Sequence, residues 1–105
     1  MDEKKIQEMQ MIEQTLQNVL LQKQAFQMEL SETEAALGEI KKSGEEVFKI
    51  IGRLMIKTDK KKMQEELAEK KKVLELRTKT LEKQEKSSVE KLESLRGEFM
   101  ASMEK

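Results

Sequence analysis

The sequence predicts a mainly α protein, an antiparallel two-helix coiled-coil hairpin with one central β-hairpin. Three observations support this fold class. Apolar residues recur with heptad spacing on both sides of residues 45–60, at steps of three and four before this stretch and of seven after it. That stretch, EEVFKIIGRLMIKTDK, is dense in Val, Ile, Leu and Phe. The 105 residues include no Pro, and 40% of them are charged, so long solvated helices can run unbroken.

The first helix is expected over about residues 3–43. Its apolar seam occupies ten positions, eight of them apolar: Met9, Ile12, Leu16, Val19, Lys23, Phe26, Leu30, Thr33, Leu37 and Ile40. A pattern sustained for more than four heptads is typical of a coiled coil. Lys23 and Thr33 are the polar exceptions, and buried polar residues can fix the register of paired helices. Two lysines followed by a serine and Gly44 indicate where the helix ends.

The second helix is expected over about residues 59–103, with Thr58 or Asp59 as its N-cap. Its seam is sparser. Leucines spaced by multiples of seven mark it, with a serine in the gap: Leu67, Leu74, Leu81, Ser88 and Leu95. The intervening seam positions are polar residues with long stems that can cover apolar surface: Lys70, Arg77, Gln84 and Lys91. Beyond Leu81 the apolar residues shift in phase, which predicts looser packing toward the end of the chain: Val89, Leu92, Phe99 and Met103.

The two seams are nearly equal in length, and their midpoint falls on Ile51 and Gly52. A chain folded back at this point places Ile40 beside Met63. The central stretch therefore forms the turn of an antiparallel helical hairpin, and residues 1–105 are expected to form a single domain.

The turn itself is predicted to be a β-hairpin over about residues 46–58. The runs VFKII and LMIKT are separated by Gly52-Arg53, and Gly at the first position of a two-residue loop fits a type II′ turn. Both faces of such a hairpin are largely apolar, and both of its edges are unpaired. One interpretation is a connector that packs onto its own helices. We favour an assembly element that other subunits complete, through these residues: Val47, Phe48, Ile50, Ile51, Leu54, Met55 and Ile56.

At this point the sequence resembles a known family. VFKIIGRLMIKTDK, followed by LELRTKTLEKQE at 74–85, is similar to the β-type subunits of prefoldin, also called GimC. The resemblance covers nearly the whole chain, and the hairpin segment is its most specific part. The chain departs from the family at Arg53, where a better turn former is expected, and in its short KKSGEE linker. An α-type subunit would need two hairpins, for which there is no room.

The resemblance implies a hetero-hexamer of two α-type and four β-type subunits, in which the hairpins join into an intersubunit β-barrel that carries six coiled coils. It also implies that the coiled-coil tips hold unfolded polypeptide and pass it to a group II chaperonin without ATP. The expected function is thus that of a cytoplasmic chaperone subunit. The alternative is a structural or adaptor coiled coil that tethers specific partners, which would not need an apolar central hairpin.

Methionine-rich apolar residues at the two ends of the chain are the candidates for client binding, because flexible, polarisable Met suits surfaces with many partners. They are Ile6, Met9, Met11, Leu95, Phe99, Met100 and Met103. Met9 and Leu95, like Ile12, can equally complete the coiled-coil seam. The others beyond Ile6 lie off the regular seam or past its end and are expected to be exposed.

Other function classes find little support in the sequence. The chain has no His, no Cys and no Gly-rich phosphate loop, so we expect no enzyme, catalytic residue, metal site or cofactor. No signal peptide and no apolar run near 18 residues is present, which favours a soluble, intracellular protein without a membrane partner. The lysine runs 60–62 and 70–72 are interleaved with acids at 65, 66, 69 and 75 and lack a stacking aromatic nearby, so no nucleic-acid partner is expected.

Overall fold

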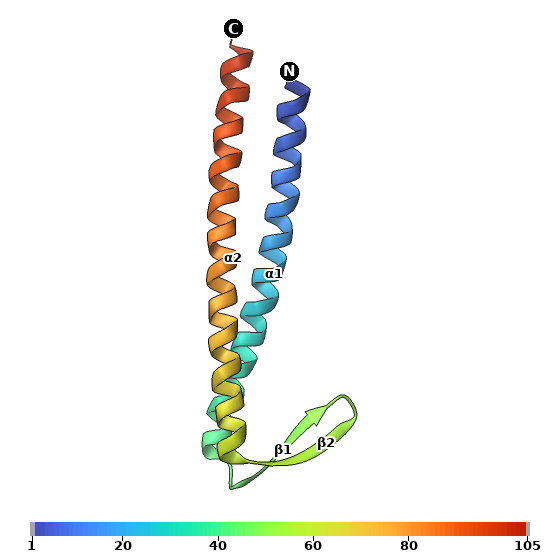
Figure 1. Cartoon of the computed structure of the whole chain (residues 1–105), viewed down its shortest axis with the longest axis vertical. Coiled ribbons are helices and arrows are strands. Elements are labelled where there is room, and N and C mark those ends of the chain that lie inside the picture. Colours follow the sequence, from blue (N-terminus) through green and yellow to red (C-terminus); the bar gives the residue numbers. More distant parts are fainter. Residues whose placement is uncertain (1, 105) are drawn as a thin grey trace. The chain divides into compact units, whose positions relative to one another are not determined.

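The computed structural model describes residues 2–104, which form two helices and one β-hairpin in the predicted order (Figure 1). The elements are α1 (Asp2–Lys42), β1 (Glu46–Ile51), β2 (Leu54–Asp59) and α2 (Lys60–Met103). They divide into two compact units. The terminal unit holds the start of α1, up to Ala25, and the end of α2, from Thr78 onward. The hairpin unit holds Phe26–Arg77.

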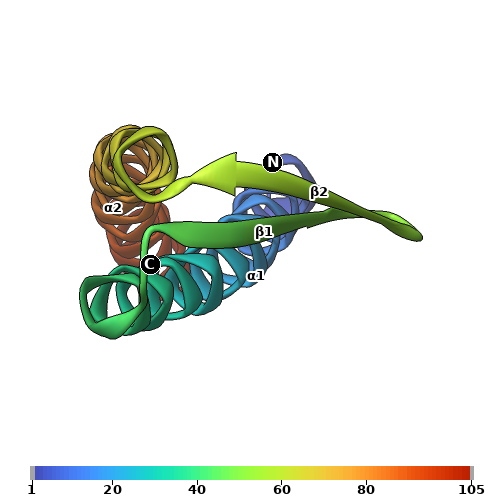
Figure 2. The same cartoon turned by 90° about the horizontal axis from the view of Figure 1, so that it is seen from below.

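The strands form the predicted antiparallel hairpin (Figure 2). Ile51 lies opposite Leu54 and Ile50 opposite Met55, as predicted. Gly52 has a φ of 60°, and no other described residue has a positive φ. This combination fits a type II′ turn, in which only the first loop residue adopts a positive φ. Arg53 therefore occupies a position that a residue with a Cβ can adopt without strain.

Helix α1 ends next to the predicted Gly44, but a left-handed glycine does not cap it, because Gly44 has no positive φ. Side chains satisfy the last carbonyl groups instead. The Ser43 hydroxyl donates to the Ile40 carbonyl oxygen at 2.9 Å. The Lys60 amine donates to the carbonyl oxygens of Lys41 and Ser43 at 3.3 and 3.1 Å. A lysine at the start of α2 thus fixes the end of α1.

Helix α2 begins with a side-chain cap from Asp59, one of the two predicted candidates. The Lys62 backbone N–H donates to Asp59 Oδ1 at 2.7 Å. This bond satisfies one of the free N–H groups of the first turn, and such caps contribute about 1 kcal/mol.

The predicted seam of α1 is confirmed, since all ten of its positions are buried or half-buried. Val19, Thr33 and Ile40 are the most buried of them. The Thr33 hydroxyl donates to the Glu29 carbonyl oxygen of its own helix at 2.7 Å, so this buried polar group is satisfied. Thr33 therefore packs in the seam without needing a partner on α2.

The prediction for the seam of α2 is confirmed for half of its positions. Its leucines and Ser88 lie in the seam, but the prediction for the positions between them is wrong. Lys70, Arg77, Gln84 and Lys91 are exposed, and the residue after each of them is less exposed: Lys71, Thr78, Glu85 and Leu92. The seam keeps alternating steps of four and three up to Phe99, so the predicted change of phase beyond Leu81 is also wrong. Leu92 and Phe99 are its regular members.

The two helices run antiparallel in each unit. In the hairpin unit, Lys71 Nζ lies 3.9 Å from Glu34 Oε1. The Arg77 guanidinium lies 6.0 Å from the centre of the Phe26 ring, over its face. In the terminal unit, the start of α1 and the end of α2 lie side by side, and Lys5 Nζ lies 3.8 Å from Glu98 Oε2. These pairs confirm the fold-back expected from the two seams.

Candidate functional surfaces

The β-hairpin buries few of its apolar side chains against its own helices. On β1 only Val47 and Lys49 are half-buried, and on β2 only Thr58. The apolar residues of the remaining hairpin positions are exposed: Phe48, Ile50, Ile51, Leu54, Met55 and Ile56. Burial of such a side chain away from water is favourable by about 1.5–3 kcal/mol. Covering this surface with a partner would therefore release a large free energy. The interpretation of the hairpin as a connector covered by its own helices does not fit this exposure.

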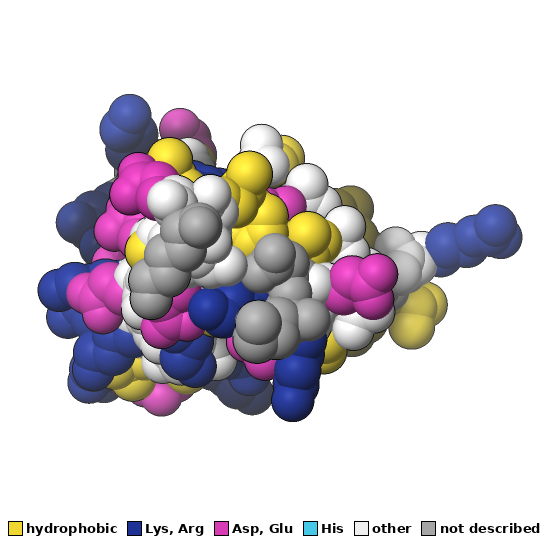
Figure 3. Space-filling model, turned by 90° about the horizontal axis from the view of Figure 1, so that it is seen from above, with side chains coloured by type: hydrophobic (Ala, Val, Ile, Leu, Met, Phe, Trp, Pro, Cys, Tyr) yellow, Lys and Arg dark blue, Asp and Glu magenta, His cyan; other side chains and the backbone are white. Residues whose placement is uncertain are grey.

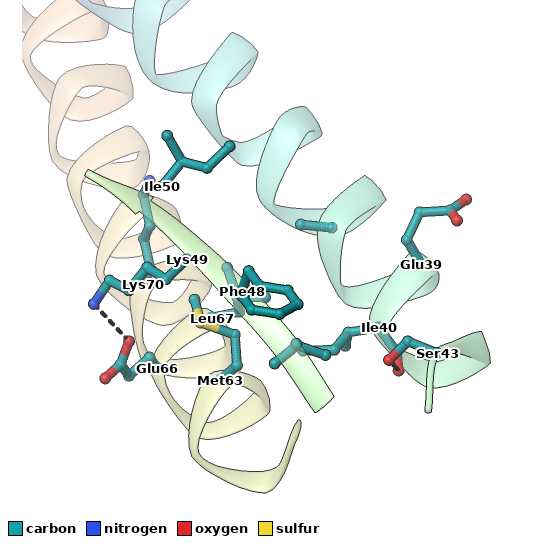
Figure 4. A pocket seen from close by; sticks show the side chains of 12 residues that line it. Glu39, Ile40, Ser43, Phe48, Lys49, Ile50, Met63, Glu66, Leu67 and Lys70 are labelled. Carbon is teal, nitrogen blue, oxygen red and sulfur yellow. Dashed lines mark hydrogen bonds and ion pairs between the residues drawn. The ribbon is translucent and has the colours of Figure 1, made fainter. Parts of the chain in front are cut away.

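A groove lies between the hairpin and the adjoining helix ends of the hairpin unit (Figure 4). Ile40 of α1, Phe48 of β1 and Leu67 of α2 are among its lining residues, and its volume is about 740 Å³. The Lys49 amine donates to Glu66 Oε2 at 3.0 Å, and both residues line the groove. The groove is thus mainly apolar, with one ion pair between β1 and α2. Sequence reasoning missed its helical residues, because their approach to β1 depends on how the strands leave the helices.

The hairpin also offers two open edges for strand pairing. In a two-residue hairpin the residues that flank the loop form a hydrogen-bonded pair, and bonded and non-bonded pairs then alternate. The register makes Ile51 and Leu54 the first bonded pair. The backbone groups of Ile50 and Met55 therefore point outward, as do those of the pair Phe48 and Lys57. Such edges can pair with strands of another chain.

The paired helix ends in the terminal unit form the second candidate surface, which we call the tip. Met11, Met100 and Met103 have 71, 60 and 68% of their surface exposed, as predicted, and Ile6 has 37%. Seen end-on, hydrophobic side chains gather between charged ones at the ends of the two helices (Figure 3). Arg96 and Glu13 form one of the ion pairs beside them, with 3.8 Å between Nη2 and Oε1.

The remaining tip candidates belong to the seam. Met9, Leu95 and Phe99 are half-buried. For Met9 and Leu95 this agrees with the alternative that they complete the coiled coil. For Phe99 the expected exposure is wrong, because the seam of α2 extends to this residue. The freely exposed apolar surface of the tip is therefore carried mainly by methionine.

Inside the terminal unit, the seam contains an ion pair that sequence reasoning did not foresee. The Lys23 amine donates to Glu85 Oε1 at 3.0 Å, and both side chains are largely covered. This hydrogen bond is the main reason that the pKa of the Lys23 amine is raised above its ordinary value. The polar position predicted in the first seam is therefore matched by a partner of opposite charge in the second.

Metal-binding groups and membrane-spanning helices are the other features to consider in the described part of the chain. No group of three or more Asp and Glu side chains in residues 2–104 could hold a metal ion. Neither described helix is apolar enough over a sufficient length to cross a membrane. The hairpin and the tip are therefore the surfaces to compare with known proteins.

Comparison with known proteins identifies the family. The sequence model of the prefoldin subunit family matches residues 3–105. This chain belongs to the prefoldin family. It is 49% identical over 85 residues to a prefoldin subunit beta of Thermococcus onnurineus. The aligned region covers 79% of this chain and 73% of the relative. It is 42% identical over 90 residues to a prefoldin subunit beta of Pyrobaculum islandicum, covering 84% of this chain and 72% of the relative.

A solved structure agrees with this assignment to prefoldin. The crystal structure of the prefoldin beta subunit from Thermococcus strain KS-1 matches with a TM-score of 0.87 at 38% sequence identity. The match covers 96% of this chain and 90% of that chain. The resemblance to β-type prefoldin subunits seen in the sequence is thereby confirmed, as is the fold class of two helices and one central hairpin. The chain is a prefoldin chaperone subunit, a kind of protein that assembles with other prefoldin subunits.

Proposed function

We propose that this chain is a β-type subunit of an ATP-independent holdase, which captures unfolded polypeptide at its tips and delivers it to a group II chaperonin. The observation that carries the proposal is the exposure of Met11, Met100 and Met103 near the paired helix ends of a prefoldin subunit. Methionine adapts its shape to apolar groups of many kinds. Such a tip suits clients that share exposed apolar residues and little else.

Assembly is the task proposed for the hairpin. Its exposed faces and open edges are completed by neighbouring hairpins, which join into a β-barrel in a hexamer of two α-type and four β-type subunits. The residues at this interface are those predicted: Val47, Phe48, Ile50, Ile51, Leu54, Met55 and Ile56. The groove beside Phe48 is continuous with this surface and gives apolar side chains of a neighbour a place to pack.

Several arms then act together on one client. Each tip offers only a few apolar side chains, so a single arm binds weakly. Arms joined in one assembly raise the effective concentration of the second and later contacts. This mode of holding requires neither nucleotide nor cofactor, and we propose that the assembly works in the cytoplasm, where nascent chains are made. Catalysis forms no part of the proposal.

The proposal can be tested by shortening the arms. Removal of residues 1–8 and 97–105 deletes most of the exposed tip but leaves the hairpin intact. We expect the truncated assembly to keep its mass and to lose most of its ability to suppress aggregation of a denatured test protein. Light scattering of intact and truncated assemblies at matched concentration, with and without ATP, measures this.

Equal protection by both assemblies would contradict client binding at the tips. Protection that requires ATP would contradict the proposed mechanism of holding. If neither assembly protected the test protein while both bound specific folded partners, the chain would be an adaptor coiled coil instead.

A further inference from the structure

A row of outward side chains on α1 carries no charge. The row lies in the terminal unit and, like the seam, steps alternately by three and four residues. All of its members are exposed: Gln7, Gln10, Gln14, Gln17, Leu21 and Gln24. In the chain as a whole, 40% of residues are charged. The outer side of α2 in the same unit does carry charges, and it exposes Lys83 and Glu90. The absence of charge thus distinguishes this row from the outer side of α2.

The row also contains an apolar hollow. Gln17, Leu20, Leu21 and Gln24 line a depression of about 280 Å³ on the terminal unit. Leu20 and Leu21 are 43 and 65% exposed, and neither belongs to the seam. The charged residue between them and Gln24, Lys23, is paired with Glu85 in the seam. We call this surface, the row together with Leu20, the glutamine face.

We propose that the glutamine face binds extended, uncharged apolar segments of unfolded polypeptide. A leucine or valine of such a segment covers Leu20 and Leu21 in the hollow. Each glutamine amide can both donate and accept hydrogen bonds, so it can pair with the backbone N–H and C=O groups of any sequence. A charged segment would lose its water here without gaining an opposite charge, which costs free energy.

The chemistry of the face favours an extended segment over a helix of another subunit. A helix satisfies its backbone groups internally and needs an apolar row to pack against, whereas five of the six row members are glutamine. An extended segment has free backbone groups to offer. Gln17 and Gln24 lie about 10.5 Å apart along the helix axis at 1.5 Å per residue. About three residues of extended chain span the same distance.

This inference rests on the proposed holdase function and extends its client surface. The row begins at Gln7, next to the tip residue Ile6, and Leu20 lies about 21 Å from Ile6 along the helix axis. A client segment held at the tip could therefore continue along the glutamine face. Binding to this face would not depend on the order of the client's side chains.

A matched pair of exposed leucines tests the inference. Leu21→Ser removes an apolar side chain from the glutamine face, and Leu76→Ser removes one of similar exposure, 61%, from α2. The probe is a dansyl-labelled peptide of alternating leucine and serine with blocked ends, measured by fluorescence anisotropy with the assembled complex. We expect Leu21→Ser to weaken binding about tenfold, equivalent to about 1.4 kcal/mol, and Leu76→Ser to bind like the wild type.

Cross-linking provides a second readout that does not depend on affinity. The chain has no cysteine, so a benzophenone can be attached at one position, with Gln24→Cys on the face and Lys83→Cys on α2 as control. Labelling of the peptide by the first variant and not by the second would support the inference. Cross-links from Gln24→Cys to another subunit instead of to the peptide would overturn it.

The two proposals fail in different ways. If the wild-type assembly suppresses aggregation but Leu21→Ser binds the peptide as tightly as wild type, the glutamine face is not a client site and the holdase function stands. If the wild-type assembly neither binds the peptide nor suppresses aggregation, both proposals are wrong.

Discussion

Leu74 and Leu76 stand two positions apart on α2 in opposite environments. Leu74 is buried in the seam, and Leu76 is largely exposed. We expect Leu74→Ala to lower the free energy of unfolding by about 2–5 kcal/mol, because it removes buried methyl groups and leaves a cavity. Leu76→Ala should change it by no more than about 0.5 kcal/mol. Urea denaturation followed by circular dichroism measures both, and equal losses would show that the seam is misplaced.

Lys23 gives the coiled coil a dependence on alkaline pH. Its pKa is raised in the folded chain, chiefly by the hydrogen bond to Glu85. The contribution of this pair to stability is therefore fully present below the ordinary lysine pKa of 10.5 and is lost as pH rises through the raised value. Comparison of the wild type with Lys23→Gln isolates the effect of this one amine.

We expect the difference in free energy of unfolding between wild type and Lys23→Gln to be constant from pH 7 to about 10 and to shrink above it. Denaturation curves at a series of pH values measure this difference. A double-mutant cycle with Glu85→Gln provides the control, since it isolates the coupling between the two side chains. A difference that grows as the pH rises would have the wrong sign for this pair.

At the scale of elements, the hairpin is the segment whose sequence is hardest to reconcile with an isolated chain. Ile51 and Leu54 flank its turn and are exposed. We expect Ile51→Asp or Leu54→Asp to prevent assembly, since a charge would be buried without a partner at the interface. The helices should survive, because neither residue contributes to the seams. Sedimentation velocity and circular dichroism measure the two effects, and a variant that kept the mass of the wild-type assembly would exclude this role.

The helices also show which parts of the fold the sequence could predict. The α1 seam was found completely because eight of its ten positions are apolar, so the pattern has one possible phase. On α2 the positions between the leucines are polar in either phase as far as Glu85, and Lys70 could not be told from Lys71 by hydrophobicity. Leu92 and Phe99 carried the deciding signal, since each lies four residues after a seam position. Against a seam through Lys70 and Lys91 they predict a change of phase, although they continue the regular pattern of the seam through Lys71.

For the whole molecule, the fold and the family followed from the sequence more readily than the detail of the surfaces. The hairpin register could be predicted because Gly52 fixes the turn and the apolar runs on either side are equal in length. The groove beside Phe48 could not, since it depends on the direction in which the strands leave the helices. The tip was predicted in composition, but the burial of Phe99 depended on where the seam ends.

The measurement that tests the central claim most directly is native mass spectrometry of the chain mixed with an α-type prefoldin subunit. The claim is that the exposed hairpin of this 12.3 kDa chain exists to build a chaperone assembly. We predict one dominant species of six subunits with four copies of this chain and two of the α-type subunit. The mixture should lose this species when Ile51→Asp replaces the wild type. Two components that stay separate, or an assembly that forms equally well with the variant, would contradict the claim.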